Sequence, residues 1–159
     1  MARINNRIYP SELFQYRGRN YLFGFAPSEK TSKGAYSQYL LFMKTITGIL
    51  GEFGIHMSNN GYAFIIDAVM VIIDMRSLDI RLNSDVYPYI AYKYEYKRYS
   101  SIEHNIRNAI RSAYRDNERH PGTNKMGIFE RVPTNKQFLF YVTECVWRSM
   151  QDEILPAAC

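Results

Sequence analysis

The stretch YSSIEHNIRNAIRSAYR, residues 99–115, decides the fold that the sequence predicts. Apolar side chains recur in it at the spacing of one helical face. They are Ile102, Ile106, Ala109, Ile110, Ala113 and Tyr114. The opposite face is polar and carries Glu103, His104, Arg107, Asn108, Arg111 and Arg115. We therefore expect an amphipathic helix that buries one stripe and exposes a mostly basic surface.

The segment before this helix, SDVYPYIAYKYEY at 84–96, also predicts a helix. Ser84 can cap its first turn, and Pro88 comes early enough to be tolerated there. Two helices joined by a few residues, the second with a polar outer face, are typical of a helix-turn-helix. We expect this motif at about 84–116, with a recognition helix at about 100–116.

Three further helices are expected, at 35–54, 58–79 and 133–155. The second is apolar nearly all round from Phe64 to Ile73, which is typical of a helix at the centre of a bundle. Either Thr134 or Asn135 can cap the last helix, and the loop at 118–132 has room for one helical turn. The predicted fold is an all-α bundle of about five to six helices that contains the helix-turn-helix.

The N-terminal residues differ from the rest of the chain. Two aromatic-rich runs flank Arg17-Gly18-Arg19-Asn20, and both Gly18 and Asn20 tolerate turn geometry, so a β-hairpin is predicted here. The stretch APSEKTSKG that follows is typical of a linker. The sequence thus predicts an N-terminal extension at 1–34, forming a hairpin or an arm, and a helical domain at 35–155.

Charge is distributed unevenly along the 159 residues, whose formal net charge is +5. Residues 1–50 and 97–136 each carry a net charge of +5, whereas 51–96 and 137–159 are net negative. A clustered basic excess fits a polyanionic partner, and ordinary solubility charge fits it equally well. The charge pattern therefore leaves both interpretations open.

Other features indicate a cytoplasmic protein. The two cysteines, Cys145 and Cys159, form neither a disulfide framework nor a zinc pattern, which fits a reducing compartment. The N-terminus has no apolar run typical of a signal peptide. The most apolar run, YAFIIDAVMVIID, is short and is interrupted by Asp67, so it predicts a buried helix and no membrane span.

No convergent set of catalytic groups is visible. The histidines, His56, His104 and His120, are scattered and lack metal-ligand spacing. Cys145 lies in an apolar helical pattern, which indicates a core residue. We therefore expect no enzymatic activity, no cofactor and no metal.

The polar face of residues 99–115 admits two interpretations. Arg can hold guanine through two hydrogen bonds, Asn can hold adenine, and a carboxylate can accept from the cytosine amino group, so the face could read DNA bases. Alternatively, Ser100 and Glu103 form a capping box in which Glu103 bonds back to its own helix start. In that case Arg107 and Arg111 are plain solvated charge.

Four ordered segments resemble a known family. They are ILGEFGIHMSNNGYAFIIDAV, VYPYIAYKY, SSIEHNIRNAIRSAY and PTNKQF. Together they resemble the C-terminal DNA-binding domain of the sporulation master response regulator, stage 0 sporulation protein A. The resemblance covers roughly residues 40–150.

This resemblance implies an all-α domain of about six helices that binds double-stranded DNA at a short promoter element. The implied protein partners are RNA polymerase and further subunits that bind in tandem on adjacent boxes. In the family, the positions of Glu103, His104 and Arg107 face base edges in the major groove. An arginine is usual where His104 stands, and a histidine where Asn108 stands, so we expect a related but altered promoter element.

The expected site combines base-reading and phosphate-binding residues. Glu103, His104, Arg107 and Asn108 are the predicted base-reading side chains. The predicted phosphate contacts are Lys97, Arg98, Ser100, Ser101, Arg111, Arg115 and Arg131. The predicted function is sequence-specific transcriptional regulation.

Several departures from the family keep other functions open. The turn between Tyr94 and Ser100 is about one residue longer than usual, and the stretch up to Pro133 is about four residues shorter, which predicts a reduced fifth helix. The first forty residues are too few for a receiver domain. In its place we expect a DNA-contacting arm, a dimerisation hairpin or padding over the bundle. The rival functions are a protein-interaction module, acting as an antagonist on the full-length regulator or the polymerase, and nonspecific DNA binding.

Overall fold

The computed structural model describes residues 14–16, 19–21, 33–75, 79–96 and 98–154. Five α-helices make up most of the described chain. They are α1 (Lys33–Glu52), α2 (Tyr62–Met75), α3 (Tyr87–Lys93), α4 (Ser100–Arg119) and α5 (Asn135–Ile154). A π-helical turn, η1 (Leu82–Val86), leads into α3, and a 3-10 turn, η2 (Lys125–Ile128), lies between α4 and α5. The predicted all-α bundle is confirmed.

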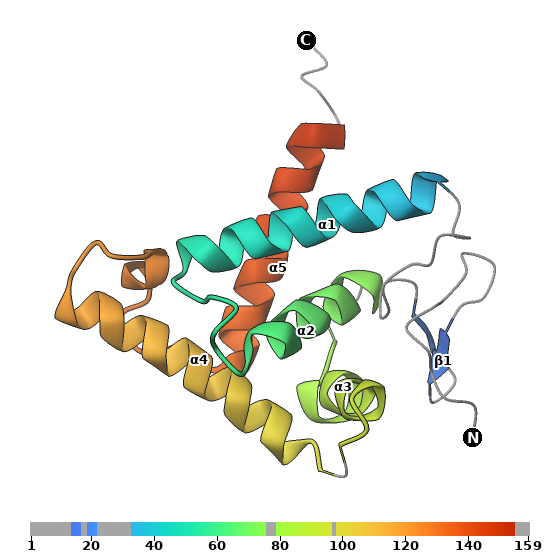
Figure 1. Ribbon diagram of the computed structural model, residues 1–159, viewed down its shortest axis with the longest axis horizontal. Coiled ribbons are helices and arrows are strands. Elements are labelled where there is room, and N and C mark those ends of the chain that lie inside the picture. Colours follow the sequence, from blue (N-terminus) through green and yellow to red (C-terminus); the bar gives the residue numbers. More distant parts are fainter. Residues whose placement is uncertain (1–13, 17–18, 22–32, 76–78, 97, 155–159) are drawn as a thin grey trace.

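The helix α2 occupies the middle of the bundle. All ten of its residues from Phe64 to Ile73 are buried. It packs against α1, α3, α4 and α5, and Figure 1 shows it in green between α1 on one side and α3 and α4 on the other. The prediction of a central helix from its all-round apolar character is therefore confirmed.

The N-terminal ribbon is short. The strands β1 (Phe14–Tyr16) and β2 (Arg19–Tyr21) pair antiparallel, with Phe14 opposite Tyr21 and Tyr16 opposite Arg19. This agrees with the hairpin predicted around Arg17–Asn20. The helix α1 begins at Lys33, two residues before the predicted start.

The start of α5 is fixed by a reciprocal capping box. The backbone N–H of Gln137 donates to Thr134 Oγ1 at 3.2 Å, and the backbone N–H of Thr134 donates to Gln137 Oε1 at 3.0 Å. Each side chain thus satisfies a backbone donor that the helix start leaves unpaired. Of the two predicted caps, Thr134 is the one used, and Asn135 is free for another role.

The helix-turn-helix begins differently from the prediction. Ser84 does not cap a helix; the turn η1 starts two residues earlier at Leu82, and the backbone N–H of Arg81 donates to Asp85 Oδ2 at 2.8 Å. Asp85 therefore closes the first turn in place of Ser84. Pro88 lies in the first turn of α3, as predicted.

None of the helices in the described ranges is long and apolar enough to cross a membrane.

Candidate nucleic-acid interface

The buried face of α4 is the one predicted from its periodicity. Ile102, Ile106, Ala109, Ile110, Ala113 and Tyr114 are all buried. They pack α4 against α2, α3, η2 and α5. The helix extends to Arg119, three residues beyond the predicted end. Its opposite face lies along the outside of the bundle (Figure 1).

The exposed face of α4 presents the predicted base-reading side chains together. His104 and Asn108 are exposed, while Glu103 and Arg107 are half-buried. The Arg107 guanidinium donates to the Glu103 carboxylate, one helical turn away. The capping-box interpretation of Glu103 is wrong, because α4 begins with Tyr99 as its N-cap residue and no side chain bonds back to the helix start.

A groove of about 850 Å³ runs beside this pair. Glu103, Arg107 and Arg111 of α4 form one wall. The other walls come from residues 81–84, at the beginning of the helix-turn-helix, and residues 132–136, at the start of α5. The groove therefore brings three segments that are distant in sequence to one edge of the recognition helix.

The predicted phosphate-binding residues do not all lie in one place. Arg98, Ser100 and Ser101 are exposed at the start of α4. Arg111 and Arg115 line a second depression of about 290 Å³, shared with Asn108, Ser112, Asp116 and Arg119. Arg131 lines a different, apolar groove along α5, and Lys97 lies outside the described residues.

Asn135 fixes the recognition helix from behind, a role that the sequence did not reveal. Its side chain is buried, and its amide nitrogen lies 3.0 Å from the backbone carbonyl of Glu103 and 3.0 Å from Tyr87 Oη. One amide thus connects α3, α4 and α5. Burial raises the pKa of the Tyr87 hydroxyl, and the hydrogen bond that it accepts from Asn135 opposes that rise.

An ion pair inside the bundle anchors the turn between α3 and α4. Asp67 of α2 is only 7% exposed, and its carboxylate accepts from Lys93 Nζ at 2.8 Å and from Tyr94 Oη at 2.6 Å. The Phe64 ring stacks edge-on against Tyr94 and Tyr96, with centroids 5.2 and 5.8 Å apart. The turn itself includes Glu95 at a φ of 60°. These contacts set the position from which the recognition helix departs.

Titration of Asp67 should be visible in the pH dependence of stability. Burial raises the pKa of its carboxyl above the usual 3.8, and the Lys93 ammonium opposes that rise. Because the pKa is raised in the folded protein, protonation of Asp67 stabilises the fold. This stabilisation is complete below pH 3.8 and is lost as the pH rises through the raised pKa. Relative to Asp67→Asn, which does not titrate, wild type should therefore gain free energy of unfolding on acidification. Urea unfolding of both proteins between pH 7 and pH 4 measures this difference; a constant difference contradicts it.

The helix α4 approaches the start of α2 closely at Gly61. A Cβ atom at this position would lie 2.4 Å from the backbone oxygen of Asn105 and 3.1 Å from Cα of Ile106. Only glycine fits such a contact without a shift of the backbone. Gly61 therefore determines how deeply the recognition helix seats in the bundle.

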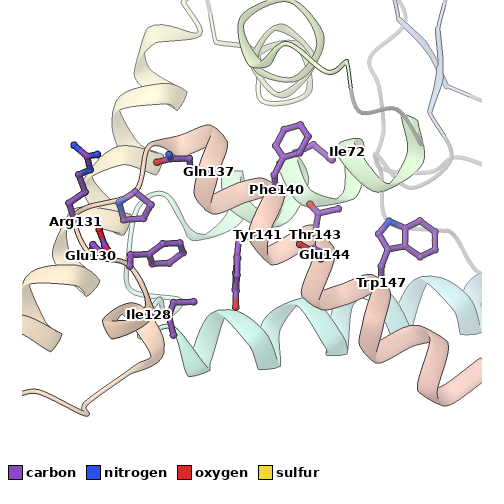
Figure 2. A pocket seen from close by; sticks show the side chains of 12 residues that line it. Ile72, Ile128, Glu130, Arg131, Gln137, Phe140, Tyr141, Thr143, Glu144 and Trp147 are labelled. Atoms are coloured by element: carbon purple, nitrogen blue, oxygen red, sulfur yellow. The ribbon is translucent and has the colours of Figure 1, made fainter.

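The apolar groove of about 910 Å³ lies along α5 (Figure 2). Phe140, Tyr141 and Trp147 line it together with Ile128 from the end of η2. Trp147 is 37% exposed, and Glu130, Arg131 and Glu144 contribute charged groups. No group of three or more potential metal ligands gathers in the part of the chain that the structure describes.

Comparison with known families points to one of them. The family model described as "Sporulation initiation factor Spo0A C terminal" matches residues 46–146, well over half of the chain. The matched region runs from the second half of α1 into α5 and includes the whole helix-turn-helix. No curated protein and no solved structure matches the chain.

Proposed function

Because the chain belongs to the family of Spo0A C-terminal domains, which are DNA-binding effector domains of a sporulation regulator, we propose that it is a sequence-specific transcriptional regulator. Its helix α4 would lie in the major groove of a short promoter element. The observation that carries this proposal is a row on the outer face of α4, made of the half-buried Glu103 and Arg107 and the exposed His104 and Asn108. This base-reading row lies at the edge of a groove lined by basic residues.

Each residue of the row has a distinct chemical role in this proposal. Arg107 donates two hydrogen bonds to a guanine, and Glu103 accepts from a cytosine amino group. His104 and Asn108, exposed one residue further round the helix, contact neighbouring bases. Neutral histidine offers one donor and one acceptor, so His104 selects a different base pattern from that of an arginine.

Arg98, Ser100, Ser101, Arg111 and Arg115 would bind phosphates around the base-reading row. Arg131, in the apolar groove, and Lys97 complete the predicted set.

DNA as the ligand implies action in the cytoplasm. The 45 residues before the matched region are too few for a receiver domain of ordinary size, so we propose that no receiver within these 159 residues controls binding.

Replacing Arg107 with alanine tests base reading. Binding to the preferred duplex should weaken by roughly 1–3 kcal/mol, and discrimination should relax at one base pair, because a bidentate contact is lost. Fluorescence anisotropy at physiological salt, with a duplex selected from a randomised pool and its single-base variants, measures both effects. Arg148→Ala is the matched control. Arg148 forms the same kind of i,i+4 pair with Glu144 on α5, and neither residue lines the groove beside α4.

Two results would redirect the proposal. Equal weakening of Arg107→Ala on every duplex would make Arg107 a phosphate contact. Equal, weak binding of wild type to selected and scrambled duplexes would indicate nonspecific DNA binding.

The apolar groove with its exposed Trp147 favours a second candidate function, a protein-interaction module that acts on the full-length regulator or on RNA polymerase. Salt dependence separates the candidates. Affinity for DNA falls steeply with added salt because counterions are released, whereas an apolar protein contact depends little on salt. Tight, salt-insensitive binding to purified regulator or polymerase, with no preference among duplexes, would favour the second candidate.

A further inference from the structure

The groove beside Glu103 and Arg107 contains more positive charge than the recognition helix alone supplies. Arg81, before η1, and Lys136, in the first turn of α5, line it opposite Arg111 of α4. None of these three cations forms an ion pair within the described ranges. The one carboxylate among the lining residues, Glu103, is paired with Arg107. The groove therefore has an uncompensated positive charge.

Hydrogen bonds order the backbone beside both Arg81 and Lys136. The N–H of Arg81 is bound by Asp85, which closes the turn η1. Lys136 directly follows Asn135, whose amide donates to the carbonyl of Glu103. A phosphate bound by Lys136 would thus lie beside a backbone that is hydrogen-bonded directly to the recognition helix.

The groove also continues along α4. Arg111 lines both the groove and the depression, which contains Arg115, Arg119 and one carboxylate, Asp116. This arrangement forms an open basic track beside the recognition helix, which suits an extended chain of phosphates better than one small anion. The Lys136 ammonium lies 5.6 Å from the Phe140 ring centroid, where the ring face attracts the cation.

We propose that this groove is a second binding element for DNA, in which Arg81 and Lys136 hold phosphates of one backbone strand flanking the bases read by α4. The inference rests on the proposed function and adds two residues outside the recognition helix. Since phosphates carry no sequence information, Arg81 and Lys136 should contribute affinity and register, and no base preference.

The test uses Arg81→Gln and Lys136→Gln, with Arg148→Gln and Lys44→Gln as controls on exposed surfaces outside the groove. Anisotropy titrations on the selected duplex at several salt concentrations give the affinity and the salt slope. Each groove variant should bind roughly 3- to 10-fold more weakly at physiological salt, and its slope of log K against log salt should fall by about 0.9. The single-base preferences should not change, and the controls should match wild type.

Single methylphosphonate substitutions, which neutralise one phosphate at a time, locate the contacts. Wild type should lose affinity at two positions flanking the selected bases. Arg81→Gln should be insensitive at one of them and Lys136→Gln at the other. Thermal unfolding midpoints equal to that of wild type would show that the folds are intact.

The outcomes distinguish the inference from the proposed function. Unchanged slopes and an unchanged methylphosphonate profile in both variants would overturn the inference, even if wild type reads sequence. Equal binding of wild type to selected and scrambled duplexes would overturn specific recognition, while reduced slopes in the variants would still support the phosphate site. No binding of wild type to any duplex would overturn both.

Discussion

Asp67→Ala is expected to lower the free energy of unfolding by about 3–5 kcal/mol, the usual cost of breaking a buried ion pair by removing one partner. The substitution takes away the carboxylate that accepts from Lys93 at 2.8 Å and from Tyr94 at 2.6 Å. Lys93 is only 14% exposed, so water restores little of the lost interaction. Urea unfolding at neutral pH measures the change.

Two control variants identify the cause of this loss. Asp67→Asn keeps an oxygen for Lys93 and Tyr94, so it should cost less than Asp67→Ala. Glu144→Ala breaks a solvent-exposed pair with Arg148 and should cost less than about 1 kcal/mol. A loss of only 1 kcal/mol in Asp67→Ala would show that the network is not a structural anchor.

Gly61→Ala is the second large effect, with an expected loss of about 3 kcal/mol, because overpacking a tight contact forces the backbone to move. The new Cβ would lie 2.4 Å from the Asn105 oxygen and 2.8 Å from its carbonyl carbon. Neither atom belongs to a flexible side chain that could give way. Thermal and urea unfolding report the loss of stability. Anisotropy at low temperature, where the variant is folded, reports the displacement of α4 as weaker binding to the selected duplex.

Gly48→Ala is the matched control for this prediction. Gly48 lies within α1, and a Cβ there would meet no atom within 4 Å. Alanine is a better helix former than glycine, so this variant should gain about 0.5–1 kcal/mol. Equal effects of the two substitutions would show that the close approach of α4 is not the reason why position 61 requires glycine.

The sequence predicted those parts of the fold that depend on local periodicity. The buried stripe of α4 and the apolar α2 follow from the spacing of residues within one helix, and Thr134 was one of the two caps predicted for α5. The two local errors, at Ser84 and at the Glu103 capping box, arose because neighbouring residues compete to start a helix. Asp85 closes the turn at Arg81, and Tyr99 occupies the N-cap position of α4.

The features that hold the candidate site together could not be predicted in this way. Asp67 was visible only as an interruption of an apolar run, since its partner Lys93 lies 26 residues away. Asn135 was visible only as a capping candidate, and Gly61 as one glycine among nine. Their roles depend on which backbone atoms other helices bring next to them, and periodicity within a segment contains no information about that. The base-reading assignments of Glu103, His104, Arg107 and Asn108 remain predictions.

The hydrogen bond from Asn135 to the carbonyl of Glu103 has a consequence for the order of events during protein synthesis. The two residues are separated by 32 positions. At about 5–20 residues per second, a ribosome adds Asn135 roughly 2–6 s after Glu103. During this interval the nascent recognition helix lacks both the hydrogen bond from Asn135 and the wall of the groove that α5 provides. We therefore expect the recognition helix to take its final position only after the start of α5 has been synthesised.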